Sequence, residues 1–226
     1  MTETNEITNR EELEKEYERA RLNPDLREDF VKRIHFEEFE PFVGRVIYEG
    51  ELTEPYFTCW PFELKKVSNE CGSKTKKFPL EVHQKAFKKL SLDEFLSSII
   101  DHEGRHTKFH SDEINITICP EMILLYDKLS FSYFEAIRKY SPKEEISDWS
   151  LYSFTVRYSE VIAYTHQLVQ IKNGRRFIGD EFKTLLDDNL QFYYAYAVDD
   201  LKKASISSDR RIQLEELLQI EKRKLE

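Results

Sequence analysis

A buried helix predicted for residues 91–106 constrains the fold of this chain more than any other feature. Ser91 and Glu94 form a capping box, in which a serine begins the helix and a glutamate three positions later binds back to it. Apolar residues then follow at the i, i+3, i+4 spacing of one helical face, namely Leu92, Phe95, Leu96, Ile99 and Ile100. Because this stripe runs on to positions 103 and 106, with 102 on its flank, we expect the end of the helix to be buried as well.

The end of this helix carries the sequence His102-Glu103-Gly104-Arg105-His106, which has the form H-E-x-x-H. Two histidines four residues apart rise from one face of an α-helix, about one turn from each other. Two imidazoles in this arrangement can hold one Zn²⁺, and the glutamate beside the first can reach a metal-bound water. The same five residues also arise by chance, and two buried imidazoles can then be satisfied by ordinary hydrogen bonds.

A catalytic zinc ion normally has three protein ligands and one position open to water, so a third ligand is expected. Glu160 is the first candidate. It lies in the segment 151–171, whose apolar residues surround a helix almost completely, and such a helix is buried. A carboxylate inside the protein needs a cation, which is either zinc or Arg157, one turn back on the same helix.

Two further candidates lie closer to the motif in the sequence. Asp112 follows His106 by six residues, but Phe109 stands where a turn with positive φ would favour glycine. His110 lies one turn after His106, and three ligands from consecutive turns of one straight helix cannot surround a single ion. We therefore prefer Glu160 and keep Asp112 as the alternative.

The remainder of the chain predicts an α+β protein that is mainly helical, with a small sheet ahead of the motif helix. The segments 43–48 and 56–60 are rich in β-branched and aromatic residues and are predicted strands, with 114–118 as one more candidate. Residues 68–79 contain glycine, proline, serine and lysine and are predicted to form an exposed loop. Helices are predicted at 9–22, 24–35, 120–140, 143–172, 178–203 and 207–225, and Asn173-Gly174 is a typical helix end.

The composition excludes several classes of partner. A net charge of −9 argues against a nucleic-acid groove or an anionic membrane surface. No run approaches eighteen apolar residues, so no membrane-spanning helix is expected. The N-terminal residues 1–6 are polar and acidic, unlike a secretory signal. Cys59, Cys71 and Cys119 are odd in number and widely spaced, which favours a reducing, cytoplasmic location over a disulfide framework.

The motif H-E-x-x-H, followed by a predicted helix with Glu160-x-x-Ala163-Tyr164, resembles the zincin metallopeptidases. Within them it is similar to the gluzincin branch, whose third zinc ligand is a glutamate on a downstream helix. The resemblance covers about residues 43–170; H-E-x-x-H matches fully, whereas the 54 residues between His106 and Glu160 are a long spacing for a small member.

This resemblance implies that His102, His106 and Glu160 bind Zn²⁺ and that Glu103 is the general base, which takes a proton from the zinc-bound water as it attacks a carbonyl. Tyr164, one turn from Glu160, is the candidate to support the oxyanion, and plain core packing is its alternative role.

These observations predict three segments: an N-terminal helical segment at 1–40, a zincin-like catalytic core at 41–175, and C-terminal helices at 176–226 that pack on the core. The predicted function is that of a zinc-dependent hydrolase acting on a peptide or protein. The alternatives are a zincin-like domain that binds a partner without cleaving it, and a helical structural protein in which H-E-x-x-H arose by chance.

Overall fold

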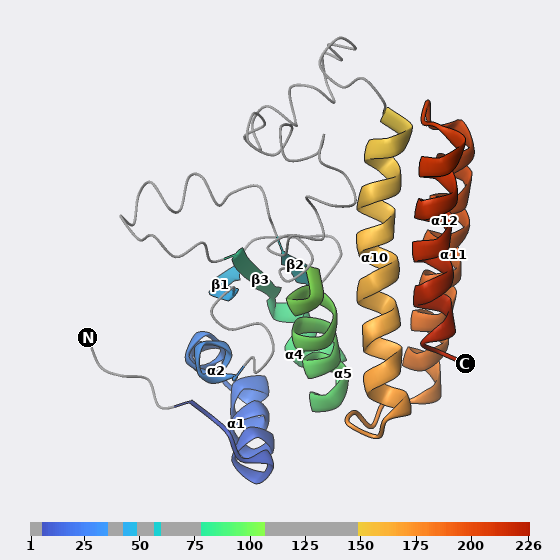
Figure 1. Cartoon of the computed structure of the whole chain (residues 1–226). Coiled ribbons are helices and arrows are strands. Elements are labelled where there is room, and N and C mark those ends of the chain that lie inside the picture. The colour runs from blue at the N-terminus through green and yellow to red at the C-terminus, as the bar shows by residue number, and fades with distance from the viewer. Residues whose placement is uncertain (1–5, 36–42, 49–56, 60–77, 107–148) are drawn as a thin grey trace. The chain divides into compact units, whose positions relative to one another are not determined.

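The computed structural model describes residues 6–35, 43–48, 57–59, 78–106 and 149–226, and these residues are mainly helical (Figure 1). The chain forms two compact units. The first comprises residues 1–108 together with Arg176–Ile178, and the second comprises 109–175 and 179–226. The predicted core segment 41–175 therefore contributes to both units. The predicted elements at 114–118 and 120–140 lie outside the described residues.

The first unit begins with two helices at the positions that the sequence predicts. Helix α1 (Arg10–Leu22) starts at Asn9, whose side chain accepts a hydrogen bond from the Glu11 amide at 2.8 Å. The asparagine cap satisfies one of the amides that the first helical turn leaves without a partner. A short 3-10 turn, η1 (Pro24–Leu26), then leads into α2 (Arg27–Arg33).

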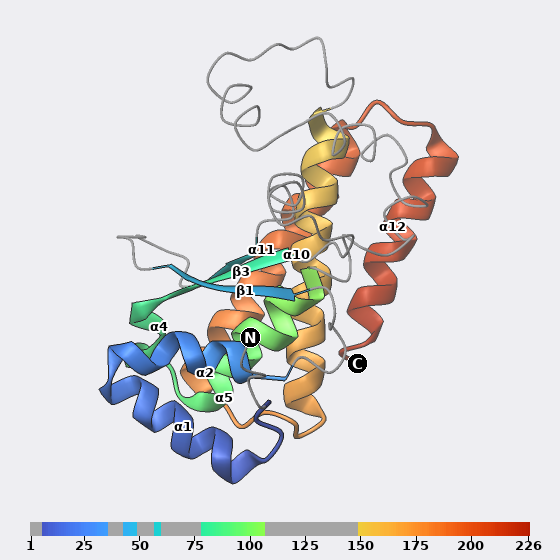
Figure 2. The ribbon, with the colours of Figure 1, turned by 90° about the vertical axis from the view of Figure 1, so that its left-hand side faces the viewer.

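Three strands of the first unit pair in the order β1-β3-β2. Strand β1 runs parallel to β3, and β2 runs antiparallel to it; Figure 2 shows β1 beside β3. The bounds are Val43–Tyr48 for β1, Phe57–Cys59 for β2 and Phe78–His83 for β3. The first two match predicted strands, whereas β3 begins inside the predicted loop 68–79. Its Pro79 lies beyond the register with β2, whose last described pair is Cys59–Leu80, so among the described residues this proline has a strand neighbour only on the β1 side.

The chain continues from β3 into the helix that carries the motif. His83 caps α4 (Gln84–Lys89) by accepting a hydrogen bond from the Lys85 amide at Nδ1. After Leu90 the predicted capping box is present: Ser91 Oγ accepts from the Glu94 amide, and the Glu94 carboxylate accepts from the Ser91 amide. It opens α5 (Leu92–Leu96), which continues without a break into a π-helix, η2 (Ser97–Glu103).

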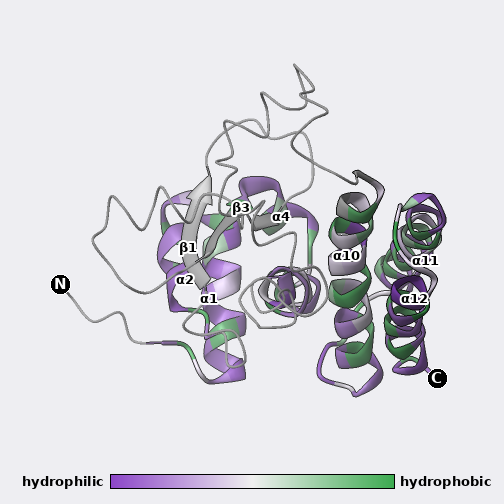
Figure 3. Cartoon of the chain, turned by 45° about the horizontal axis from the view of Figure 1, so that its top comes forward, coloured by the Kyte–Doolittle hydropathy of each residue, from purple (hydrophilic) through white to green (hydrophobic). Residues whose placement is uncertain are grey.

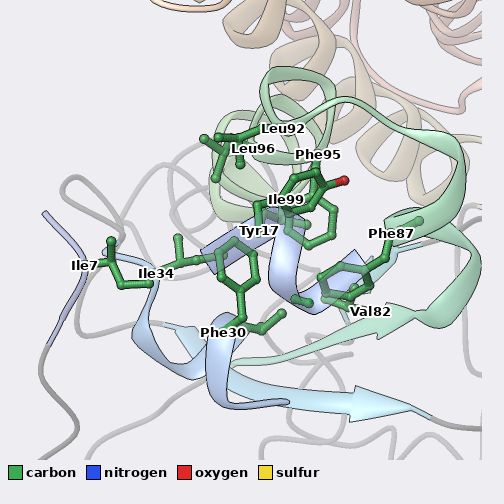
Figure 4. Packing of buried hydrophobic residues seen from close by; sticks show 13 residues of the cluster. Ile7, Tyr17, Phe30, Ile34, Val82, Phe87, Leu92, Phe95, Leu96 and Ile99 are labelled. Atoms are coloured by element: carbon green, nitrogen blue, oxygen red, sulfur yellow. The ribbon is translucent and has the colours of Figure 1, made fainter. Parts of the chain in front are cut away.

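The core of the first unit joins the N-terminal helices to the motif helix. Tyr17 of α1 lies at its centre, with its ring 5.6 Å from Phe30 of α2, 5.8 Å from Phe87 of α4 and 5.2 Å from Phe95 of α5 (Figure 4). Ile99 of η2 is fully buried in the same cluster. The N-terminal helices therefore supply part of the core against which the motif helix packs, and α1 and α2 act as structural elements of this unit.

The second unit consists, in its described part, of three helices with a core of their own. Their bounds are α10 (Trp149–Lys172), α11 (Asp180–Lys203) and α12 (Ser208–Arg223). In Figure 3 each of them combines hydrophilic and hydrophobic residues. Phe154 and Val161 of α10 pack with Leu201 of α11 and with Leu214 and Leu218 of α12. Among the described residues, no helix is both long and apolar enough to cross a membrane.

The end of α10 follows the sequence prediction. Gly174 adopts a φ of +72°, and the Arg175 amide donates to the carbonyl of Gln170 while the Gly174 amide donates to that of Ile171. Glycine reaches this left-handed conformation without the steric penalty of a Cβ atom, so Asn173-Gly174 ends the helix as expected.

Candidate metal centre

The motif begins in a π-helix. The amide of Gly104 donates to the carbonyl of Ile99, five residues back, in place of the four-residue spacing of an α-helix. This wider turn covers Ser97–Glu103, and residues 104–106 are α-helical again. π-Helical turns inserted in α-helices are rare and are often found at functional sites. The sequence predicts an ordinary α-helix here, so the π-helix is a correction to that prediction.

The two histidines of the motif face each other inside the first unit. His102 is 9% exposed and His106 is 8% exposed, so the buried end of the predicted helix is confirmed. Their Nε2 atoms lie 3.2 Å apart, and the two rings are nearly perpendicular, with an interplanar angle of 81°. The two atoms best suited to hold a metal ion therefore point toward the same place.

This separation fits two ligands of one tetrahedral zinc ion. With Zn–N bonds of about 2.0–2.1 Å, two nitrogen ligands of a tetrahedron lie about 3.3–3.4 Å apart. A separation of 3.2 Å therefore allows one ion to bind both rings with little adjustment. The same distance also permits a hydrogen bond in which the Nε2–H of one ring donates to the Nε2 of the other. The donor type, burial and spacing of His102 and His106 fit zinc.

Glu103 follows the first histidine directly and is half-buried on η2. A carboxylate in this position is partly shielded from water and is still accessible to a small reactant. On the other side of His102, Asp101 is buried, and it accepts hydrogen bonds from Nε of Arg176 at 2.9 Å and from Nη2 at 3.1 Å. The sequence does not indicate this arginine, because 75 residues separate the partners and no local pattern connects them.

Glu160 is half-buried on α10, in the second unit. On an ideal helix Arg157, Glu160 and Tyr164 lie within an arc of about 60°, so they share one side of α10. Nη1 of Arg157 donates to Asp200 of α11 at 2.6 Å. Burial raises the pKa of Tyr193 on α11, and the negative charge of Glu160 raises it further. Glu160 therefore lies close enough to α11 for its charge to act on Tyr193.

Tyr164, the residue predicted to support the oxyanion, packs between the same two helices. Its ring stacks on Tyr193 at 5.7 Å, and its hydroxyl oxygen accepts a hydrogen bond from Nδ2 of Asn189 at 3.3 Å. These contacts fix the side chain of Tyr164 within the second unit. The other predicted candidates, Asp112 and His110, lie outside the described residues. No protein-family model, curated protein or solved structure matches this chain.

Proposed function

We propose that this protein is a zinc-dependent hydrolase of the metallopeptidase type, with a zincin-like arrangement of its motif helix. One observation carries the proposal: His102 and His106 are buried, with their Nε2 atoms 3.2 Å apart, which is close to the spacing of two ligands on a single zinc ion. The half-buried Glu103 beside them supplies the residue type and position that such chemistry needs for a general base.

The proposed ligands are His102, His106 and Glu160, with Asp112 as the alternative third ligand. Glu160 supplies a carboxylate oxygen, which is a normal zinc donor alongside two imidazoles. Its partial burial supports the assignment, because a half-buried carboxylate loses less solvation on binding an ion than a fully exposed one. Two histidines and one glutamate would leave the fourth position for water.

Within this site each residue has a distinct task. Bound zinc would supply Lewis acidity, polarising a carbonyl and lowering the pKa of water. The carboxylate of Glu103 would accept a proton from the attacking water and later return it to the leaving amine. Tyr164 is the proposed hydrogen-bond donor to the developing oxyanion. The proposed substrate is a peptide or protein, and the proposed location is the cytoplasm. Neither nucleic acid nor a membrane is a proposed partner.

The first test is the zinc content of the purified protein, measured by mass spectrometry after supplementation and gel filtration. We expect about one zinc per chain, and we expect His102→Ala, His106→Ala and Glu160→Ala to lose most of it. His166→Ala is the matched control, because His166 is a half-buried histidine on α10 that contacts Gln170 and lies outside the motif. A wild-type protein without zinc would identify the histidines as a hydrogen-bonded pair. Loss of zinc in Asp112→Ala but not in Glu160→Ala would identify Asp112, in place of Glu160, as the third ligand.

The second test concerns catalysis and uses a mixture of fluorescence-quenched peptides as the substrate. Glu103→Gln keeps the size of the side chain and removes the base, so it is expected to retain zinc and to lose peptide hydrolysis by a factor of about 10²–10⁴. Hydrolysis at the wild-type rate in Glu103→Gln would remove the general-base role. Zinc binding without hydrolysis in the wild type would favour the domain that binds without cleaving.

A further inference from the structure

Two buried aspartates on the motif helix each bind an arginine through both carboxylate oxygens. Asp93 of α5 accepts from Nη1 of Arg10 at 2.6 Å and from Nη2 at 3.2 Å. Asp101 of η2 accepts from Nε of Arg176 at 2.9 Å and from Nη2 at 3.1 Å. Both aspartates are at most 5% exposed. Such two-pronged pairs fix the direction of a carboxylate more strictly than a single ion pair does.

The loop Arg176–Ile178 contacts both carboxylates. Besides the pair between Arg176 and Asp101, the amide of Phe177 donates to Oδ2 of Asp93 at 3.2 Å. The two aspartates are eight residues apart, so this short loop binds the motif helix once in its α-helical part and once in its π-helical part. The contact in the π-helical part, between Arg176 and Asp101, lies directly beside His102, the first histidine of the motif.

The π-helix needs such support because it is less favourable than an α-helix of the same residues. If η2 relaxed to an α-helix, the residues that follow it would rotate by up to about 100°, the angle of one residue. Asp101 would then turn away from Arg176, and His106 would turn relative to the buried stripe of α5. The contact with Arg176 and the direction in which His102 and His106 face relative to α5 therefore require the same helical register.

We propose that Arg176 is a positioning residue that holds η2 in its π-helical register and thereby sets the direction in which His102 and His106 face relative to the buried stripe of α5. Its action passes through Asp101 and requires no contact between Arg176 and a substrate. The consequence for zinc rests on the proposed function above, whereas the effect on helical register does not.

The register is tested in zinc-free, deuterated protein by nuclear magnetic resonance, through the scalar coupling across the hydrogen bond of the Gly104 amide. In the wild type this amide is expected to couple to the carbonyl carbon of Ile99, the π-helical partner. In Arg176→Ala the coupling is expected to move to Ile100, the α-helical partner. An unchanged coupling to Ile99 in Arg176→Ala would overturn the proposal.

Arg10→Ala is the matched control, because it removes an equivalent two-pronged contact from the same continuous helix at its α-helical part. It is expected to lower stability and to keep the coupling between Gly104 and Ile99. If Arg176→Ala does not fold, Arg176→Lys provides the same readout, since lysine keeps the charge and loses the planar fork. A shift of the coupling in Arg10→Ala as well would assign the effect to general destabilisation and overturn the proposal.

The consequence for the metal is measured as the zinc dissociation constant by competition with a chromogenic chelator. Arg176→Ala is expected to weaken zinc binding by about 10–100-fold, which is typical of residues that orient a metal ligand, whereas Arg10→Ala is expected to leave it unchanged. Unchanged affinity in Arg176→Ala would overturn the link from register to ligand position. A wild-type protein that binds no zinc would contradict the proposed function alone, because the Gly104 coupling still decides the role of Arg176.

Discussion

The histidines of the described residues differ in what their ring nitrogens contact. His83 caps α4, His35 lies 3.0 Å from a carboxylate oxygen of Glu6, and His166 contacts Gln170. Only in His102 and His106, among the histidines of the described part of the chain, do two ring nitrogens face each other. The distinction could be predicted from the sequence, because these two form the H-E-x-x-H spacing at the end of the buried stripe of the helix opened by Ser91. The geometry adds a spacing that suits a shared ion.

Asp200 offers a pH-dependent prediction at the scale of one residue. Burial raises the pKa of Asp200 above its ordinary value of 3.8, and the positive charge of Arg157 opposes this only in part. The folded protein therefore holds a proton on Asp200 at pH values where the unfolded chain has released it. As the pH rises through this window above 3.8, wild-type stability falls relative to that of a variant that does not titrate there.

We accordingly expect the free energy of unfolding of Asp200→Asn, minus that of the wild type, to increase as the pH is raised from 3 to 7. Urea unfolding at a series of pH values measures this difference, and the titrations of the other carboxylates cancel in it. Arg157 still has an oxygen acceptor in the variant, so the hydrogen bond is retained. A difference that decreases with pH would mean that attraction to Arg157 outweighs the cost of burial.

At the scale of elements, the capping box of α5 gives a second prediction. Ser91→Ala removes the oxygen that accepts from the Glu94 amide, so we expect a loss of about 1 kcal/mol in the free energy of unfolding. Ser98→Ala is the matched control, because the Ser98 hydroxyl donates to the Glu94 carbonyl within the same continuous helix and caps no helix end. Denaturant unfolding of both variants measures the difference. Equal losses would show that the cap contributes no more than an ordinary helical serine.

The helices whose ends are predictable from the sequence are those that begin at a capping side chain or end at a glycine with positive φ. Asn9, Ser91 and Gly174 each satisfy or terminate backbone groups locally, and the helices begin or end at them. Strand β3 was not predicted because Pro79 is unfavourable inside a sheet; among the described residues its strand partner is Gly44 of β1, and a local window of sequence does not show this pairing. The π-helix could not be predicted, because the spacing of apolar residues indicates a helix of about 3.6 residues per turn and does not indicate where one turn is wider.

At the scale of the whole molecule, the sequence points to candidate site residues but not to the residues that support them. H-E-x-x-H and Glu160 are candidates from residue type and spacing, since zinc chemistry restricts both. The pairs of Asp93 with Arg10 and of Asp101 with Arg176 join residues 83 and 75 positions apart. Nothing in a local window specifies which arginine meets which aspartate, because that choice is made by the packing of the folded chain.

The two hydrophobic cores lead to a prediction about cooperativity. Tyr17, Phe87 and Phe95 belong to one cluster, whereas Phe154 and Leu218 belong to another. Separate cores allow separate cooperative units, each of which opens with its own free energy. Phe95 is fully buried, so we expect Phe95→Ala to cost about 3–5 kcal/mol, a loss that falls on the first unit.

Hydrogen exchange followed by mass spectrometry distinguishes the two units. Phe95→Ala is expected to speed amide exchange in residues 10–33 and 84–103 and to leave α11 and α12 at their wild-type rates. Leu218→Ala, at a site that is 1% exposed in the other core, is expected to produce the reverse pattern. Faster exchange throughout the chain in both variants would show that the two cores unfold as a single cooperative unit. In that case a substitution in α12 would also disturb the histidine pair, and the zinc affinity proposed for this site would be expected to fall in Leu218→Ala as in variants of the motif helix.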